Sequence, residues 1–199
     1  PRKAADWLTR AALQDDKIAQ FNLGTLYTAG EGVACNPTVA YRWYLKAAAQ
    51  GHTAAMANIG VLYETGLGVK QDFAQAFKWY TMAAKPGLPT AQCNLGQLYA
   101  TGRGVQADSA KAAEWYLKAA NQGYGQAQFL LSTAYYFGNG VEQDLAKAYQ
   151  WISLAAAAGH PGAGQHRRTI GAKLTPAQLA AAAKAVREFS AKQRGKTIN

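Results

Sequence analysis

The sequence predicts an all-α fold in which helix pairs repeat every 36 residues and stack into a solenoid. A pair of glycines separated by one residue recurs at this step, in "TAGEGV", "ETGLGV", "ATGRGV" and "YFGNGV". Hydrophobic residues make up 49% of the 199, enough for a chain of this length to bury a sizeable core. Internal periodicity of this length is typical of repeat proteins. All five tryptophans keep the same step, at Trp7, Trp43, Trp79, Trp115 and Trp151.

The first helix of each pair is predicted from "AQFNLGTLYTAG". Its apolar residues follow the i, i+4, i+7, i+8 spacing that places them on one helical face. We expect the helix to end at Gly30, because glycine adopts the left-handed cap conformation without steric cost. The second glycine, Gly32, then allows the turn into the next helix. The residues of this face are Ala19, Leu23, Leu26, Tyr27 and Gly30.

The second helix is predicted from "NPTVAYRWYLKAAAQG". It begins with Asn36, a capping residue, and Pro37, which suits the first helical position. In the later units an aspartate stands in place of Asn36, and its carboxylate also favours the positive end of the helix. Those aspartates are Asp72, Asp108 and Asp144. The apolar face of the first copy consists of Ala40, Trp43, Tyr44, Ala47 and Ala48.

A helix pair of this size cannot bury its apolar face alone, so neighbouring pairs are expected to stack. We predict close helix approaches at the small residues Gly24, Gly60, Gly96 and Ser132, which recur at the 36-residue step. The predicted repeats span residues 17–52, 53–88, 89–124 and 125–160.

Both ends of the chain depart from the repeat. Residues 1–16 match only the second helix of a truncated repeat, so we expect the chain to be a fragment of a longer protein. Residues 161–199 are interpreted as a degenerate repeat followed by a basic C-terminal capping helix. That helix is predicted to start at Thr175 as the cap and Pro176 in the first turn.

The 36-residue period, with "LGxLYxxGxGV", "D…A…WY" and "AAxxG", resembles the Sel-1-like repeat (SLR) family over residues 17–159. Members are right-handed α/α superhelical solenoids related to the tetratricopeptide repeat. The resemblance implies a bacterial adaptor that binds proteins and has neither catalytic residues nor cofactors. The resemblance favours the periplasm as the cellular location. It does not decide between the cell envelope more broadly and the cytoplasm.

The resemblance also implies that the first helices line a concave groove, and the sequence offers candidate contacts on their outward face. Among them, asparagines recur at Asn22, Asn58 and Asn94, a set called here the asparagine ladder. An amide both donates and accepts hydrogen bonds, so the ladder is suited to a peptide backbone. Alternatively, these asparagines are repeat consensus, solvated or bonded within their own layer. The predicted groove residues are Asn22, Thr25, Asn58, Val61, Asn94, Gln97, Leu130, Thr133 and Phe137.

Catalytic and metal-binding motifs are poorly matched. A dinucleotide loop needs a third glycine, and the four corners carry other residues there. The sequence has neither C-x-x-C nor H-E-x-x-H, so no metal site is predicted. Cys35 and Cys93 fall in different units, and we expect two free thiols. The residues at the third-glycine position are Cys35, Gln71, Ala107 and Gln143.

The net charge of +10 is uneven along the chain. Residues 161–199 hold 8 Lys/Arg against 1 Asp/Glu, whereas residues 1–160 hold 13 against 10. This tail suggests one alternative function, binding to nucleic acid, acidic lipid or an envelope polymer through Arg167, Arg168 and Lys173. Of these ligands, nucleic acid is the least expected. A second alternative is a structural spacer with no partner. No apolar run is long enough to span a membrane.

Overall fold

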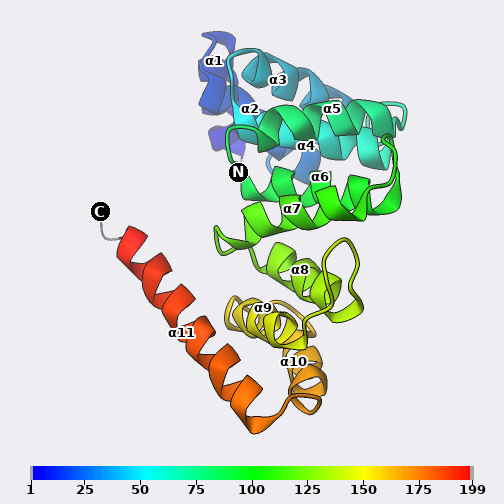
Figure 1. Ribbon diagram of the computed structural model, residues 1–199. Helices are drawn as coiled ribbons and strands as arrows, with labels where there is room; N and C mark the ends of the chain where they lie inside the picture. The colour runs from blue at the N-terminus through cyan, green and yellow to red at the C-terminus, as the bar shows by residue number, and fades with distance from the viewer. Residues whose placement is uncertain (1, 198–199) are drawn as a thin grey trace. The chain divides into compact units, whose positions relative to one another are not determined.

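The computed structural model describes residues 2–197, and within them it contains eleven α-helices and no strand (Figure 1). Pro1, where the predicted truncated repeat begins, lies outside the described residues, as do Ile198 and Asn199 at the end of the predicted C-terminal segment. The helices are α1 (Arg2–Leu13), α2 (Lys17–Ala29), α3 (Pro37–Ala49), α4 (Thr53–Thr65), α5 (Phe73–Ala84), α6 (Pro89–Thr101), α7 (Ser109–Ala120), α8 (Gly125–Phe137), α9 (Leu145–Ala157), α10 (Ala163–Gly171) and α11 (Pro176–Thr197).

The chain divides into two compact units. Unit 1 comprises residues 1–91 with 103–105, and unit 2 comprises residues 92–102 with 106–199. In unit 1, α2 packs against α3 and α4 packs against α5, whereas in unit 2 α8 packs against both α7 and α9 (Figure 1). The predicted all-α architecture of repeated helix pairs is therefore confirmed.

The helix ends lie where the capping residues predicted them. The side chain of Asn36 accepts a hydrogen bond from the backbone N–H of Val39 at 3.1 Å. The aspartates that begin the later second helices accept equivalent bonds at 2.9–3.0 Å. Gly30 has a φ of 75°, and its N–H donates to the carbonyl of Leu26 at 2.8 Å. These bonds satisfy backbone groups that a helix end would otherwise leave without partners.

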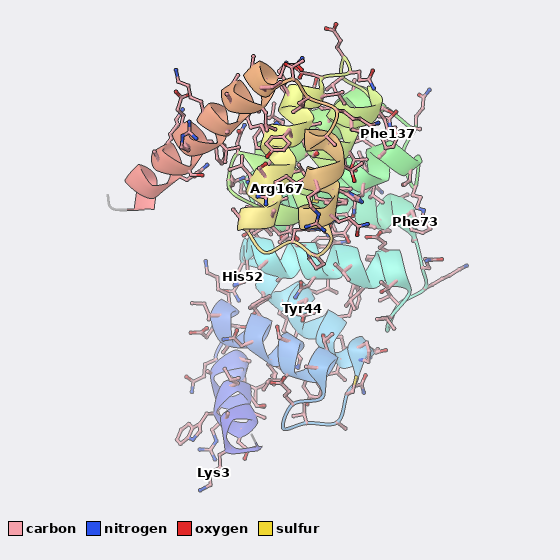
Figure 2. All side chains as sticks on the ribbon, turned by 90° about the horizontal axis from the view of Figure 1, so that it is seen from below. Lys3, Tyr44, His52, Phe73, Phe137 and Arg167 are labelled. Carbon is pink, nitrogen blue, oxygen red and sulfur yellow. The ribbon has the colours of Figure 1, made fainter. Side chains whose placement is uncertain are left out.

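Close approaches occur at the predicted glycines, and each brings a helix against a tyrosine ring. A Cβ atom added to Gly24 would lie 2.6 Å from the ring of Tyr44, which is labelled in Figure 2. Gly60 stands in the same relation to Tyr80, at 2.5 Å. Tyr44 and Tyr80 are among the largest fully buried side chains, so these glycines make room for the core of each pair.

The tryptophans share one sequence register but differ in burial. Trp43 packs against the apolar cluster of α1 and α2 that contains Ala12 and Leu23. Trp151 is 6% exposed and meets Phe189 edge to face at 5.5 Å between ring centroids. Trp7, on the first described helix α1, is 68% exposed.

Two helices follow the last regular pair. The short helix α10 buries Ala163 and Ile170 against the apolar residues of α9. The backbone N–H of Thr175 donates to Oε1 of Gln178 at 2.9 Å, and the N–H of Gln178 donates back to Oγ1 of Thr175 at 3.3 Å. This reciprocal pair is a capping box, and it confirms the predicted start of α11. Further along, α11 packs Phe189 on α9.

Candidate functional site

The predicted groove residues lie on first helices and have exposed or half-buried side chains; among them, Leu130 packs against the buried cluster that contains Tyr116. In unit 1, Thr25 of α2 and Val61 of α4 are exposed, while Asn22 and Asn58 are half-buried. In unit 2, Asn94 and Gln97 of α6 are half-buried, and Phe137 at the end of α8 is 64% exposed. Each unit therefore presents its own stretch of this surface, called here the first-helix face.

The side chains of the asparagine ladder make no hydrogen bond with any part of the chain that the structure describes. The alternative of bonding within their own layer therefore finds no support in residues 2–197. Neighbouring hydroxyls behave differently: Thr25 donates to the carbonyl of Phe21 at 3.2 Å, and Thr65 donates to that of Val61 at 2.8 Å. The amides thus keep both donor and acceptor atoms for a ligand or for water.

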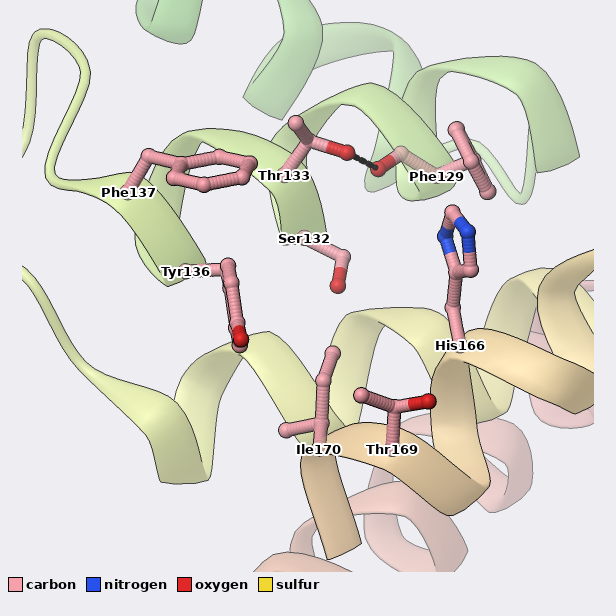
Figure 3. Close-up of a pocket in the computed structure, with 8 residues that line it drawn as sticks. All are labelled: Phe129, Ser132, Thr133, Tyr136, Phe137, His166, Thr169 and Ile170. Atoms are coloured by element: carbon pink, nitrogen blue, oxygen red, sulfur yellow. Dashed lines mark hydrogen bonds between the residues drawn. The ribbon is translucent and has the colours of Figure 1, made fainter. Parts of the chain in front are cut away.

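A pocket of about 290 Å³ lies between α8 and α10 in unit 2 (Figure 3). This volume is close to the lower limit for ligand pockets and is enough for one large side chain. Thr133 and Phe137, both predicted groove residues, contribute to one wall. The residues that line the pocket are Phe129, Ser132, Thr133, Tyr136, Phe137, His166, Thr169 and Ile170.

Three of the four hydroxyl groups that line the pocket donate to backbone carbonyls, and the fourth, on Tyr136, accepts a hydrogen bond from Lys173. Thr133 donates to the carbonyl of Phe129 at 3.1 Å (Figure 3). Ser132 donates to the carbonyl of Ala148 at 2.7 Å. Thr169 donates to the carbonyl of Gln165 at 3.3 Å. With their donors used in this way, the side chains present mainly methyl groups and aromatic rings to the cavity. The pocket therefore suits an apolar group.

The rim of the pocket carries a cation. The Nζ atom of Lys173 lies 4.8 Å from the centre of the Tyr136 ring and also hydrogen-bonds to the Tyr136 hydroxyl. This combines a cation–π contact with a hydrogen bond. His166 stacks on Phe129 with ring centroids 5.1 Å apart. Lys173 is thereby held beside an otherwise apolar cavity.

The remaining predicted site residues do not join this pocket. Leu130 lines a separate cavity of about 200 Å³ with Tyr116 and Thr133. Arg167 and Arg168 are exposed on α10 and are not among the residues lining the pocket; Arg167 is labelled in Figure 2. Of the three predicted anion contacts, Lys173 alone meets a pocket-lining residue, Tyr136.

Sequence reasoning missed the α10 side of this pocket, although a signal for it exists. Adding 36 to the predicted positions Leu130, Thr133 and Phe137 gives His166, Thr169 and Lys173. The first two line the pocket and the third lies at its rim. The consensus residues are lost after residue 163, so the predicted groove positions were not extended into the degenerate fifth repeat.

The possible metal ligands and the two cysteines of the described chain do not add to the candidate site. Among the described residues, no group of three or more His, Cys, Asp or Glu side chains could hold a metal ion. Burial raises the pKa of the Cys93 thiol to about 12, so it stays protonated, whereas Cys35 is exposed. Within residues 2–197, no helix has both the length and the hydropathy needed to cross a lipid bilayer.

Comparison with known proteins identifies the family. The model of the Sel1 repeat matches residues 1–16, 17–52, 53–87, 89–124 and 125–160, so the chain belongs to the Sel1 repeat family. Members are generally non-catalytic scaffolds, and their repeats commonly mediate protein–protein interaction. A comparison with curated proteins found no significant match.

Solved structures agree with this assignment. The protective antigen c5321 of uropathogenic Escherichia coli, which displays an SLR fold, is 37% identical with a TM-score of 0.91. The match covers 98% of this chain but only 42% of c5321. A Sel1 repeat protein from Oxalobacter formigenes is 31% identical with a TM-score of 0.80, over 92% of this chain and 75% of that one. The immunity protein Pa5087 from Pseudomonas aeruginosa, at 22% identity and a TM-score of 0.57 over 96% of this chain and 72% of its own, shares the fold alone.

Proposed function

We propose that this chain is a non-catalytic scaffold that binds a protein or peptide on its first-helix face. The observation that carries the proposal is the apolar pocket between α8 and α10, with Phe137 64% exposed at its edge. A preformed pocket next to an exposed aromatic ring is typical of the anchor positions that dominate binding energy at protein interfaces.

The asparagine ladder supports the same proposal. Its amides have free donors and acceptors in both units, so they can bind the backbone of an extended peptide. Val61, 38% exposed, adds apolar surface beside Asn58 on α4. A rigid helical surface loses little conformational entropy on binding, so modest contacts can give useful affinity.

Selection from a phage-displayed random peptide library on the full chain tests the proposal. We expect enriched peptides whose affinity falls at least about 10-fold in Phe137→Ala, since anchor residues contribute on the order of 2 kcal/mol. Trp7→Ala is the matched control: its ring is 68% exposed, but α1 corresponds to the second helix of a pair and is not part of the first-helix face, so affinity should be unchanged. Isothermal titration calorimetry gives the affinities.

The asparagines are tested by a double variant, Asn58→Ala with Asn94→Ala. We expect weaker binding of the selected peptides with unchanged helicity by circular dichroism, because neither amide bonds to the described chain. If no peptide is enriched, the spacer alternative is favoured. If only polyanions bind, with an affinity that falls steeply with salt, the anionic-surface alternative is favoured.

A further inference from the structure

We propose that the pocket between α8 and α10 binds an acidic segment of a partner protein. In that segment a large apolar side chain fills the pocket, and an adjacent Asp or Glu places its carboxylate against Lys173. This inference rests on the proposed function and specifies the chemistry of the partner. The inference is argued from three features of the pocket: its lining, the charges around it, and the hydrogen bonding of the backbone N–H groups of its lining residues.

The interior of the pocket selects an apolar side chain. Of its four hydroxyls, those of Ser132, Thr133 and Thr169 already donate to backbone carbonyls at distances of 2.7–3.3 Å. The fourth, on Tyr136, accepts a hydrogen bond from Lys173 at the rim. A polar group entering the cavity would lose its water and gain little in return. Aromatic and aliphatic lining from Phe129, Phe137 and Ile170 instead offers contact to a ring or a branched chain. A volume of about 290 Å³ admits one such side chain.

The charges around the pocket select an acidic neighbour. Helix α8 carries no charged residue, and residues 145–187 contain six Lys/Arg but no Asp or Glu. Two of these six are paired with acids just outside the segment, Lys147 with Asp144 at 3.3 Å and Lys184 with Glu188 at 3.9 Å. Among the described residues, Lys173 forms no ion pair, and its ammonium has three donors, of which Tyr136 accepts one. A carboxylate beside Lys173 would therefore meet an uncompensated positive potential.

The carboxylate is assigned to a side chain rather than to a chain terminus. Capture of a terminal carboxylate relies on a nest of free backbone N–H groups. Here the lining residues of α8 and α10 lie within helices, and even His166, near the start of α10, donates its N–H to the carbonyl of Gly162 at 3.2 Å. Lys173 is a flexible point charge, which suits a side-chain carboxylate of variable position.

Three synthetic peptides test this inference on the full chain. Each is acetylated and amidated at its ends and contains one Phe flanked on both sides by Asp, by Asn or by Lys. Fluorescence anisotropy at low salt should rank the affinities Asp over Asn over Lys. We expect the Asp peptide to bind about 5-fold more tightly than the Asn peptide, the upper range for an exposed ion pair. At 0.5 M salt the preference should largely disappear.

Variants at the rim separate charge from packing. Lys173→Gln should abolish the Asp-over-Asn preference while leaving the Asn peptide bound, and Lys173→Glu should reverse the order in favour of the Lys peptide. Lys118→Gln is the matched control, because Nζ of Lys118 also lies over an aromatic ring, 3.8 Å from the centre of Trp115, yet lines no part of this pocket. Phe137→Ala should weaken all three peptides.

The outcomes distinguish the inference from the proposed function. If wild type binds the Asp and Asn peptides equally and Phe137→Ala weakens both, the acidic partner is refuted while the scaffold function stands. Tighter binding of a peptide with a free C-terminal carboxylate would overturn the assignment to a side chain. If none of the peptides binds and the random library yields no enrichment, both proposals fail.

Discussion

Buried glutamines link the ends of neighbouring helices, and the side-chain oxygen of one of them has no partner. Oε1 of Gln20 accepts a hydrogen bond from Gln50 at 3.0 Å, and Oε1 of Gln92 accepts one from Gln122 at 2.8 Å. Gln128 occupies the equivalent position in the next pair and is 2% exposed, but its Oε1 has no partner. The residue 36 positions after Gln122 is Ala158, which has no side-chain amide.

Ala158→Gln should therefore stabilise the protein. Its amide would donate to Oε1 of Gln128, as Gln122 does to Gln92, and a net gain of about 1 kcal/mol is expected. Urea denaturation followed by circular dichroism measures the change. Ala157→Gln is the control, because Ala157 is an exposed neighbour that does not correspond to Gln122. Equal effects of both substitutions would show that the buried oxygen is not the cause.

The pairing of glycine with tyrosine could be predicted only in part. The small residues were identified from their 36-residue step, but their partner was not, because sequence spacing does not show which ring occupies the space. The fourth pair makes the relation visible: Ser132 replaces the glycine, and Ile152 replaces the tyrosine. The smaller Ile152 leaves room for a hydroxyl, which donates to the carbonyl of Ala148.

At the scale of elements, the glycine-rich corner does more than turn the chain. A Cβ atom on Gly140, the second glycine of its corner, would lie 2.0 Å from the carbonyl oxygen of Ser109. In unit 1, a Cβ atom on Gly68 would lie 2.4 Å from the carbonyl carbon of Pro37, and Thr38 donates to the carbonyl of Gly68 at 3.0 Å. Each of these corners therefore rests on the start of the preceding second helix. This contact arises from stacking, so local turn rules predicted the turn but not the contact.

Gly140→Ala should be much more destabilising than Gly159→Ala. Both glycines have positive φ, 73° and 77°, so both substitutions incur the left-handed penalty of about 1–2 kcal/mol. Only Gly140 faces a backbone atom, whereas a Cβ on Gly159 would have no atom within 4 Å. Overpacking should add about 1–3 kcal/mol to the loss at Gly140. Thermal unfolding measures both, and equal losses would contradict the contact.

At the scale of the whole molecule, periodicity made most of the fold predictable. Caps, corners and small residues recur at one step, so each copy supported the interpretation of the others. The candidate site was harder to predict. Thr133 and Phe137 were identified from the sequence, but the opposite wall of the pocket belongs to α10, where the repeat consensus is lost. His166 and Ile170 became pocket residues through packing against α8, which residue type alone does not indicate.

The repeated architecture also predicts how far the effect of a destabilising substitution spreads through the molecule. In repeat proteins each pair contacts only its neighbours, so stability is close to a sum of local terms. Gly60→Ala would place a Cβ 2.5 Å from the Tyr80 ring in unit 1, and Gly140→Ala disturbs unit 2. Hydrogen exchange followed by mass spectrometry should show that each variant loses amide protection mainly in its own unit.

The matched control for this experiment is Gly164→Ala in α10, where an added Cβ would have no atom within 4 Å. Alanine favours a helix by about 1 kcal/mol over glycine, so protection should be unchanged or increased. If Gly60→Ala instead lowers protection equally in α4 and α9, the two units unfold together. Destabilisation of unit 1 would then also destabilise the pocket in unit 2. In that case the stability of this chain would not be a sum of nearest-neighbour contributions.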